Sequence, residues 1–182
     1  SWTTVRILMI LAKVYNLKMR QVDYVQAFPQ AELADGEQIF MVIPDRFTLD
    51  GNPQDHCLRL KKNVYGLRQA AYNWNNFLTA GLKTLGFTQS PHDQCLFLKH
   101  DIICVVYVDD TIFFSKSDTT INKTISALKA LNFDLTDKGD VDTFLGVQVA
   151  HHTNGSITMS QPNLIDRILE LLGLQNDSKQ HK

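Results

Sequence analysis

The sequence predicts an α+β fold in which an antiparallel sheet carries its helices on one face. Two observations lead to this prediction. Short segments with alternating or continuous apolar residues, typical of strands, stand before and after longer segments whose apolar residues recur every three or four positions, as in helices. The chain has 182 residues, 44% of them hydrophobic, which suits one globular domain with a core.

The first part of the chain predicts a helix and a strand. Residues 3–16 (TTVRILMILAKVYN) have the length of a helix with Thr3 or Thr4 as its cap. Apolar residues lie on nearly every side of this helix, so we expect it to be buried. Residues 18–25 (KMRQVDYV) alternate and include β-branched residues, which indicates a strand.

An insertion and a second helix follow. Residues 37–44 and 56–62 are expected to be strands, and the segment between them is a polar loop with glycine and proline. From Arg68 to Leu85 the apolar period becomes helical, and Gly86 supplies a stop. The apolar face of this helix contains Ala71, Trp74, Leu78, Leu82 and Leu85.

The second half of the chain continues the alternation. Strands are expected near residues 94–99, 102–108, 111–115, 133–136, 143–150 and 156–160. A helix begun by Ser117 or Asp118 carries an apolar face made of Ile121, Ile125, Leu128 and Leu131. Ser160 is expected to cap a last helix, with Pro162 in its first turn and Gly173 just past its end.

This order of elements predicts the connectivity of the sheet. Without the insertion at 31–62, the order is strand, helix, strand, strand, helix, strand, which is the ferredoxin-like, split βαβ arrangement. In that arrangement the first strand and the central hairpin can be neighbours. Asp23, at the end of the first strand, is then expected to lie near Asp109 and Asp110, at the bend of the hairpin.

The hairpin sequence CVVYVDDTIFF (104–114) places two carboxylates inside an apolar run, where an unpaired charge costs several kcal/mol or more. Three converging carboxylates either share a proton or bind a cation. Oxygen ligands suit Mg²⁺ or Mn²⁺, and the lack of an adjoining histidine or cysteine argues against zinc. Two such ions about 3.5–4 Å apart catalyse phosphoryl displacement, so the cluster indicates phosphoryl or nucleotidyl transfer.

The two adjacent aspartates are not equivalent in this prediction. Neighbouring strand residues point to opposite faces, so we expect Asp109 to be the full ligand and Asp110 a secondary one. The alternative is that the pair only forms a type I′ turn. The apolar flanks and a third aspartate, Asp23, on the neighbouring strand favour a metal site.

Charge and cysteine content set further limits. The net charge of −1 and pI of about 6.6 make no global case for nucleic-acid binding. The basic segment RLKKNVYGLR (59–68) is either a solvated face or a polyanion contact. Cys57, Cys95 and Cys104 suggest reduced core residues of an intracellular protein. No membrane segment or signal peptide is expected, and because the chain opens with Ser1 it suggests a piece of a longer protein.

Several strings together resemble one family. YVDD (107–110) inside an apolar hairpin is similar to the signature of reverse transcriptases. Five strings, one of which extends YVDD, resemble the copia-type retrotransposon branch. They stand in the family's order, and the resemblance runs from about residue 3 to residue 173. These strings are QVDYVQAF (21–28), LKKNVYGLRQA (60–70), DQCLF (93–97), VVYVDD (105–110) and FLGVQV (144–149).

The resemblance implies roles for individual residues at the reaction centre. Asp23, Asp109 and Asp110 would be catalytic and bind two Mg²⁺ ions, which Mn²⁺ could replace, and Tyr24 would add its backbone carbonyl to one ion. Phe28 matches the aromatic steric gate that excludes a ribose 2′-hydroxyl, although plain core packing is the alternative reading.

Two residues match nucleic-acid or nucleotide contacts. Gln69 matches a glutamine near the sugar and phosphates of the incoming nucleotide, at a helix start where backbone N–H groups favour phosphate. FLGVQV corresponds to the primer-gripping hairpin, where Gly146 would let a nucleic-acid backbone approach closely. A bulge at Gly146 is a compatible alternative.

The resemblance also implies a domain organisation for residues 1–182 as one partial reverse transcriptase domain, a polymerase palm with partial fingers. Palm core is expected at 1–30 and 64–150, a fingers-like insertion at 31–63, a primer-grip-like hairpin at 143–160, the start of a thumb-like helix at 161–175, and a frayed tail at 176–182. Implied partners are an RNA or DNA template with its primer, deoxynucleoside triphosphates, and missing fingers, thumb, RNase H and integrase parts of a polyprotein. The implied location is cytoplasmic, in retrotransposon particles, without membrane.

Other residues receive weaker interpretations. The resemblance places a lysine that protonates the pyrophosphate leaving group close to the position of Lys138. The sequence position of Lys138 differs from that of the family's lysine, so Lys138 is not included in the site. His151 and His152 are expected to be exposed at a strand end, and Trp74 to be core. Arg59, Lys61 and Lys62 are possible template contacts.

Two other functions stay open. The chain could be a non-catalytic remnant that folds without polymerising. It could also be another palm-type nucleotidyltransferase, such as an RNA polymerase or a nucleotide cyclase.

Overall fold

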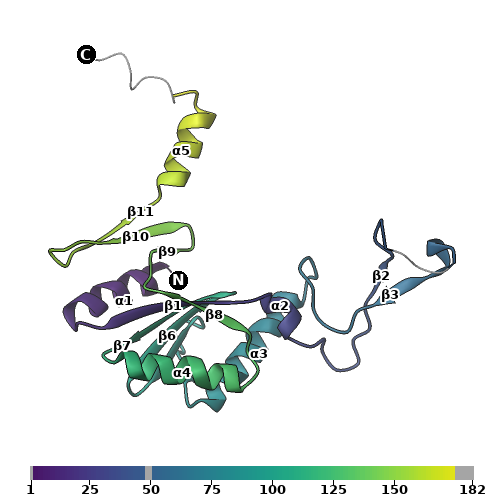
Figure 1. The fold of residues 1–182 in the computed structure, drawn as a ribbon, viewed down its shortest axis with the longest axis horizontal. Coiled ribbons are helices and arrows are strands. Elements are labelled where there is room, and N and C mark those ends of the chain that lie inside the picture. The colour runs from purple at the N-terminus through teal and green to yellow at the C-terminus, as the bar shows by residue number, and fades with distance from the viewer. Residues whose placement is uncertain (1, 48–50, 175–182) are drawn as a thin grey trace.

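The computed structural model describes residues 2–47 and 51–174, and the tail predicted at 176–182 lies outside them. Its centre is an antiparallel sheet in the order β4-β5-β6-β7-β1-β8 (Figure 1). The strands are β1 (Lys18–Tyr24), β4 (Thr88–Gln89), β5 (Leu96–Lys99), β6 (Ile102–Tyr107), β7 (Asp110–Ser115) and β8 (Leu135–Gly139). The predicted mixed α and β fold with an antiparallel sheet is therefore present.

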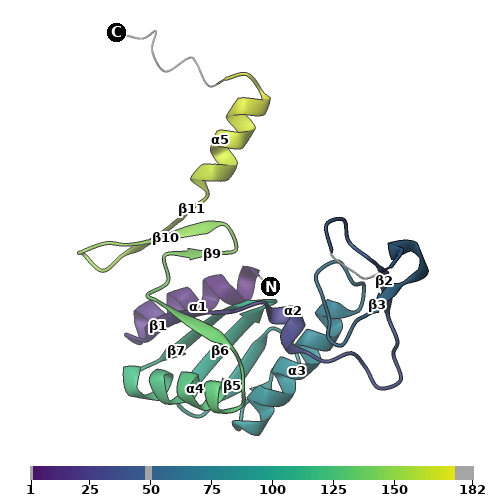
Figure 2. The same cartoon turned by 45° about the vertical axis from the view of Figure 1, so that its right-hand side comes forward.

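Helices cover both faces of this sheet, so the prediction that all of them lie on one face is wrong for the first helix (Figure 2). On one face, α3 (Ala70–Thr84) and α4 (Asp118–Ala130) pack against the sheet through a common core. On the other face, α1 (Trp2–Val14) packs through a second core. The first core includes Trp74, Leu78, Leu82, Ile121, Leu128, Val22, Tyr24 and Phe113. The second includes Val5, Leu8, Met9, Val105, Ile112 and Phe114.

Several predictions about the helices are wrong in detail. α1 is not buried all round, because the sheet covers only one side and Ile10 and Val14 are 62% and 65% exposed. It already includes Trp2, so Thr3 and Thr4 lie inside the helix and do not cap it. On α3 the buried alanine is Ala70 and not Ala71.

The predicted N-terminal cap is correct for the helix after Ser117 and wrong for the last helix. Ser117 is the cap of α4, as predicted, and its side chain accepts a hydrogen bond from the Thr120 N–H at 3.4 Å. Ser160 does not cap α5 (Pro162–Leu171), because it is still in β11 (Ile157–Ser160) and Gln161 holds the cap position. Pro162 opens the helix and Gly173 follows it with a φ of 67°, as expected.

The predicted insertion projects away from the central sheet (Figure 1). It contains the short hairpin β2 (Phe40–Val42) and β3 (Cys57–Arg59), with the 3-10 turn η1 (Pro53–Asp55) between them. These strands are shorter than predicted. A buried amide at the base of the insertion, Asn63, donates to the carbonyl oxygens of Ala31 (3.0 Å) and Glu32 (2.8 Å).

Asn63 also accepts a hydrogen bond from the Asn73 amide on α3 at 3.1 Å. A buried side-chain amide is stable only when its polar atoms have partners, so these bonds hold the two ends of the insertion together and against α3. Periodicity in the sequence gave no sign of this contact, because Asn63 lies outside any helix or strand.

The strand predicted at 143–150 is in fact two strands, β9 (Thr143–Phe144) and β10 (Val147–His151). Leu145 and Gly146 form a two-residue turn between them, with φ values of 51° and 76°. Positive φ at both positions is the type I′ geometry, so Gly146 lies in a hairpin turn and not in a bulge. With β11 these strands make a separate sheet in the order β11-β10-β9, from which α5 extends outward (Figure 1).

The cysteines only partly meet expectation. Cys104 is fully buried in the first core, and burial raises the pKa of its thiol. Cys95 is partly buried, and burial followed by the charge of Asp93 raises the pKa of its thiol as well. Cys57, however, is exposed on β3, so the prediction of a core residue is wrong there.

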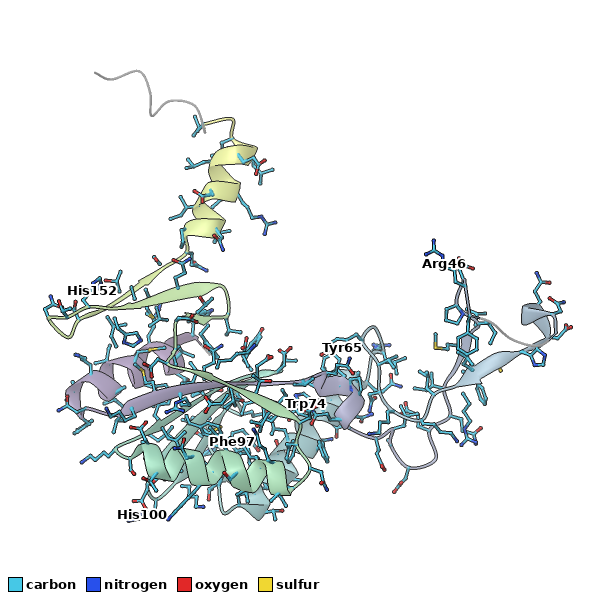
Figure 3. The ribbon with its side chains drawn as sticks, in the orientation of Figure 1. Arg46, Tyr65, Trp74, Phe97, His100 and His152 are labelled. Carbon is cyan, nitrogen blue, oxygen red and sulfur yellow. The ribbon has the colours of Figure 1, made fainter. Side chains whose placement is uncertain are left out.

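The two adjacent histidines lie where the sequence predicted them. His151 and His152 are exposed at the end of β10, as expected. His151 contacts Val141 O and His152 contacts Thr158 Oγ1 (His152 is labelled in Figure 3).

Two short elements, α2 (Ala27–Gln30) and β4, had no counterpart in the prediction. In the part of the chain that is described, none of the helices is long and apolar enough to cross a bilayer.

We expect Gly81→Ala to destabilise the chain although alanine favours helices. A Cβ at Gly81, inside α3, would lie 2.4 Å from Cε2 of the buried Phe133. Helix propensity favours alanine by roughly 1 kcal/mol, whereas overpacking of a core costs about 1–3 kcal/mol. Chemical denaturation should therefore show a lower free energy of unfolding. The exposed Asn76 of the same helix is the control: Asn76→Ala should stabilise slightly, and a stabilised Gly81→Ala variant would contradict the packing.

Candidate functional site

Pairing between β1 and β7 brings the predicted carboxylates together. Asp23, near the end of β1, is the direct partner of Asp110, the first residue of β7. Residues directly opposite in an antiparallel pair have Cβ atoms about 4.5–5.5 Å apart and point to the same face. Asp109 precedes Asp110 in the hairpin turn, and its carbonyl accepts a hydrogen bond from the Tyr24 N–H at 3.1 Å. Residues far apart in the sequence thus meet at one end of the sheet.

The hairpin turn itself is strained. Tyr107 pairs with Asp110, so the turn consists of Val108 and Asp109 and is centred one residue earlier than the aspartate pair. Val108 has a φ of 56°, which is unusual for a β-branched residue. Asp109 has no positive φ, so the turn is not type I′.

A tryptophan supports this turn. Trp74, labelled in Figure 3, is a buried core residue of α3, as predicted. Its indole N–H also donates a hydrogen bond to Val108 O at 2.6 Å. Backbone in a sparsely populated conformation persists only when its surroundings hold it. The indole therefore fixes the turn from which Asp109 and Asp110 extend. The sequence indicated the core position but not this bond.

The negative charges of Asp23 and Asp109 affect the pKa of Asp110. Burial is the largest factor that raises the pKa of Asp110, and the charges of Asp109 and Asp23 raise it further. Two neighbours lower it. The Gln21 amide donates to Asp110 Oδ1 at 3.1 Å, and the Lys138 ammonium lies 3.5 Å from Asp23 Oδ2.

Lys138 reaches the site because of an irregularity in β8. Val22 pairs with Asp137 and Gln21 with Gly139, so Lys138 is an extra residue without a partner in the β1–β8 ladder. A bulge of this kind redirects a side chain and is common beside active sites. Asp137 itself contacts Arg20, at 2.9 Å, leaving Lys138 as the cation next to Asp23.

The chemistry of the donors suits a hard divalent cation, because Asp23, Asp109 and Asp110 offer only carboxylate oxygens. Among the described residues, however, no three His, Cys, Asp or Glu side chains are arranged closely enough to hold a metal ion. Carboxylates that lack a bound cation repel one another, and this repulsion adds to burial, the largest cause, in raising the pKa of Asp110. The backbone gathers the three ligands, and a cation would still have to draw their side chains together.

Phe28, the predicted steric gate, lies just beyond the end of β1. Phe28 is in α2, and Gln30 fixes this short helix through bonds to Val25 O (2.6 Å) and Asp134 O (2.8 Å). The half-buried Phe28 ring packs on the exposed ring of Tyr65, with centroids 4.6 Å apart. Tyr65 was not among the predicted site residues, although it lies in the string 60–70.

The other predicted residues lie on other elements. Gln69 is at the start of α3, as expected, and its amide donates to Glu37 Oε1 of the insertion at 2.6 Å. Gly146 is in the β9–β10 turn, where an added Cβ would meet nothing within 4 Å. Arg59, Lys61 and Lys62 are exposed on and after β3.

We expect Asp110→Asn to raise the melting temperature of the metal-free chain at pH 7. The raised pKa means that the fold favours the neutral carboxyl, so ionisation above the ordinary Asp pKa of about 3.9 costs stability. Because the group is only half-buried, a gain of roughly 1–3 °C is expected. The gain should disappear towards pH 3, where both folded and unfolded chains bind the proton.

Thermal melts in a chelating buffer measure this effect. The exposed Asp166 of α5 supplies the control, since Asp166→Asn should show no such dependence on pH. An Asp110→Asn variant that melts at or below the wild-type temperature at pH 7 would contradict a net cost of ionising Asp110 in the folded chain.

The sequence of this chain matches a known protein family and several known proteins. The profile of the family described as "Reverse transcriptase (RNA-dependent DNA polymerase)" matches residues 1–181. The chain is 29% identical to the Retrovirus-related Pol polyprotein from transposon TNT 1-94 of Nicotiana tabacum, over 96% of this chain and 13% of that protein. It is 31% identical to the Pol polyprotein from transposon RE1 of Arabidopsis thaliana, over 96% of this chain and 12% of the relative.

A third relative, the Pol polyprotein from transposon RE2 of Arabidopsis thaliana, is 32% identical over 84% of this chain and 10% of its own length. The chain thus spans a small part of each of these curated relatives. No solved structure shows a significant match. The family match over nearly the whole chain confirms the predicted resemblance: this chain belongs to the reverse transcriptase (RNA-dependent DNA polymerase) family, with relatives among copia-type retrotransposon Pol polyproteins.

Proposed function

We propose that the chain carries the polymerase palm of a reverse transcriptase and catalyses two-metal nucleotidyl transfer. The observation that supports this best is the pairing of Asp23 with Asp110, with Asp109 in the adjoining turn. In the reaction, a primer 3′-hydroxyl attacks the α-phosphate of a deoxynucleoside triphosphate, the bond to the β-phosphate breaks, and pyrophosphate leaves. Membership of the reverse transcriptase family supports an RNA template, with DNA as a second possibility.

Asp23, Asp109 and Asp110 would hold two Mg²⁺ ions, or Mn²⁺ in their place, with the Tyr24 carbonyl as a further ligand. When bound, such ions stabilise charge on the attacking and leaving oxygens. The chain's own contribution is to fix the backbone that carries these ligands before substrate arrives, and preorganisation of this kind supplies much of the acceleration in phosphoryl transfer. Trp74 and the β1–β7 pairing provide it by fixing the backbone of the turn.

Selection of the sugar would depend on Phe28. Its ring lies five residues after Asp23 and is supported by Tyr65, a contact that limits how far it can move. We propose that Phe28 excludes the ribose 2′-hydroxyl and that Gln69, at the start of α3, contacts the nucleotide. In this proposal Gly146 and the β9–β11 sheet contact the primer, and the insertion at 31–63 acts as partial fingers.

The remaining parts of the enzyme would come from a longer polyprotein. The relatives are Pol polyproteins of which this chain covers 10–13%. We therefore propose that fingers, thumb, RNase H and integrase parts complete the activity, within retrotransposon particles in the cytoplasm.

Primer extension by the 182-residue chain tests the proposal. With an RNA template, a DNA primer and Mn²⁺ or Mg²⁺, we expect extension that a chelator abolishes. Asp23→Asn should reduce the rate by on the order of 100-fold or more, because it removes a charge that would bind the cation. Asp166→Asn is the matched control on an exposed carboxylate. Undiminished extension by Asp23→Asn would refute the assignment, whereas a wild-type chain that binds Mn²⁺ but extends nothing would favour the non-catalytic alternative.

Phe28→Val tests the sugar selectivity. A smaller side chain should admit ribonucleotides, so that the preference for deoxynucleotides, measured as a ratio of kcat/KM values, falls at least about tenfold. Phe40→Val changes an exposed phenylalanine of the insertion and should leave the ratio unchanged. An unaltered preference in Phe28→Val would count against a steric gate and in favour of another palm-type enzyme.

A further inference from the structure

Gln21 is a buried polar residue beside the carboxylates. The function proposed above gives it no role. It lies on β1 two residues before Asp23, so both side chains project from the same face of the sheet. Only 7% of Gln21 is exposed. Its amide nitrogen donates to Asp110 Oδ1 at 3.1 Å, which links the strand of Asp23 to the carboxylate of Asp110.

The orientation of the Gln21 amide follows from the chemistry of its partner. An ionised carboxylate only accepts hydrogen bonds, so the amide nitrogen has to face Asp110. This orientation leaves the amide oxygen inside the protein. Gln21 Oε1 is buried and has no hydrogen-bond partner in the structure. Buried polar atoms rarely lack partners, and an exception calls for an explanation such as a bound water or ion.

Gln21 Oε1 is closed off from solvent, so no water reaches it. The fold therefore bears the cost of an unpaired acceptor, and the contact that the amide makes in return is its hydrogen bond to Asp110.

We propose that Gln21 is the positioning residue of the metal site. Its amide nitrogen holds the Asp110 carboxylate on the face of the sheet that Asp23 also occupies, where the cation would bind. The proposal rests on the function proposed above. Gln21 acts through Asp110 and does not touch the reacting atoms, so it sets the affinity for the cation.

Mn²⁺ binding to the 182-residue chain tests this role without any catalytic turnover. Free Mn²⁺ is measured by electron paramagnetic resonance during a titration, and circular dichroism melts identify the folded variants. Gln21→Met keeps the length of the side chain but has no amide, and we expect it to weaken Mn²⁺ binding about 10–100-fold, the usual effect of removing a group that orients a ligand. Gln21→Asn keeps the amide but is one methylene shorter, so the same direction of change is expected.

The control is Thr111→Val, which removes a buried hydroxyl from the neighbouring strand. Thr111 pairs with Val22 and so points to the opposite face, and the variant should bind Mn²⁺ as the wild type does. If both Gln21 variants bind within twofold of the wild type while Asp110→Asn binds much more weakly, the inference about Gln21 is wrong and the proposed metal site stands. If Asp110→Asn also binds like the wild type, the metal site fails and the role of Gln21 fails with it.

Discussion

Antiparallel pairing between β1 and β7 sets Asp23 opposite Asp110 and determines what each face of the sheet carries. Val22 and Tyr24 point into the core under α3 and α4, so Gln21 and Asp23 have to point to the other side. A slip of one residue would bury Asp23 among aromatic rings and move Val22 to the face that carries Gln21. The apolar alternation of β1 therefore specifies the location of the carboxylates as strictly as it specifies the core.

The same corner of the sheet holds several features that reduce stability taken alone. Asp110 is close to two like charges, Val108 has a strained backbone, and Gln21 has an unpaired oxygen. Neighbouring residues offset two of these features: the Trp74 indole supports the turn, and Lys138 offsets part of the negative charge. Concentration of strain and repulsion at one place, in an otherwise well-packed domain, is typical of a site kept for function.

Sequence patterns predicted what depends on local periodicity. The α3 core position of Trp74 and the approach of Asp23 to the hairpin follow from the spacing of apolar residues and from element order. What the patterns missed depends on distant partners or on single backbone angles. Lys138 reaches the site through a bulge, Asn63 makes its bonds across the base of the insertion, and Leu145 turns the chain with a positive φ. Gln21 could have been found, since its spacing from Asp23 places both on one face.

The distribution of the cysteines has a practical consequence. Burial leaves Cys104 inaccessible and its thiol protonated, and Cys95 is partly shielded, whereas Cys57 is exposed on β3. A thiol-reactive fluorophore should thus attach mainly at Cys57 in the native chain, without any engineered substitution. The label would lie on the projecting hairpin, away from the carboxylates, and its polarisation would report the motion of that hairpin relative to the sheet (Figure 1).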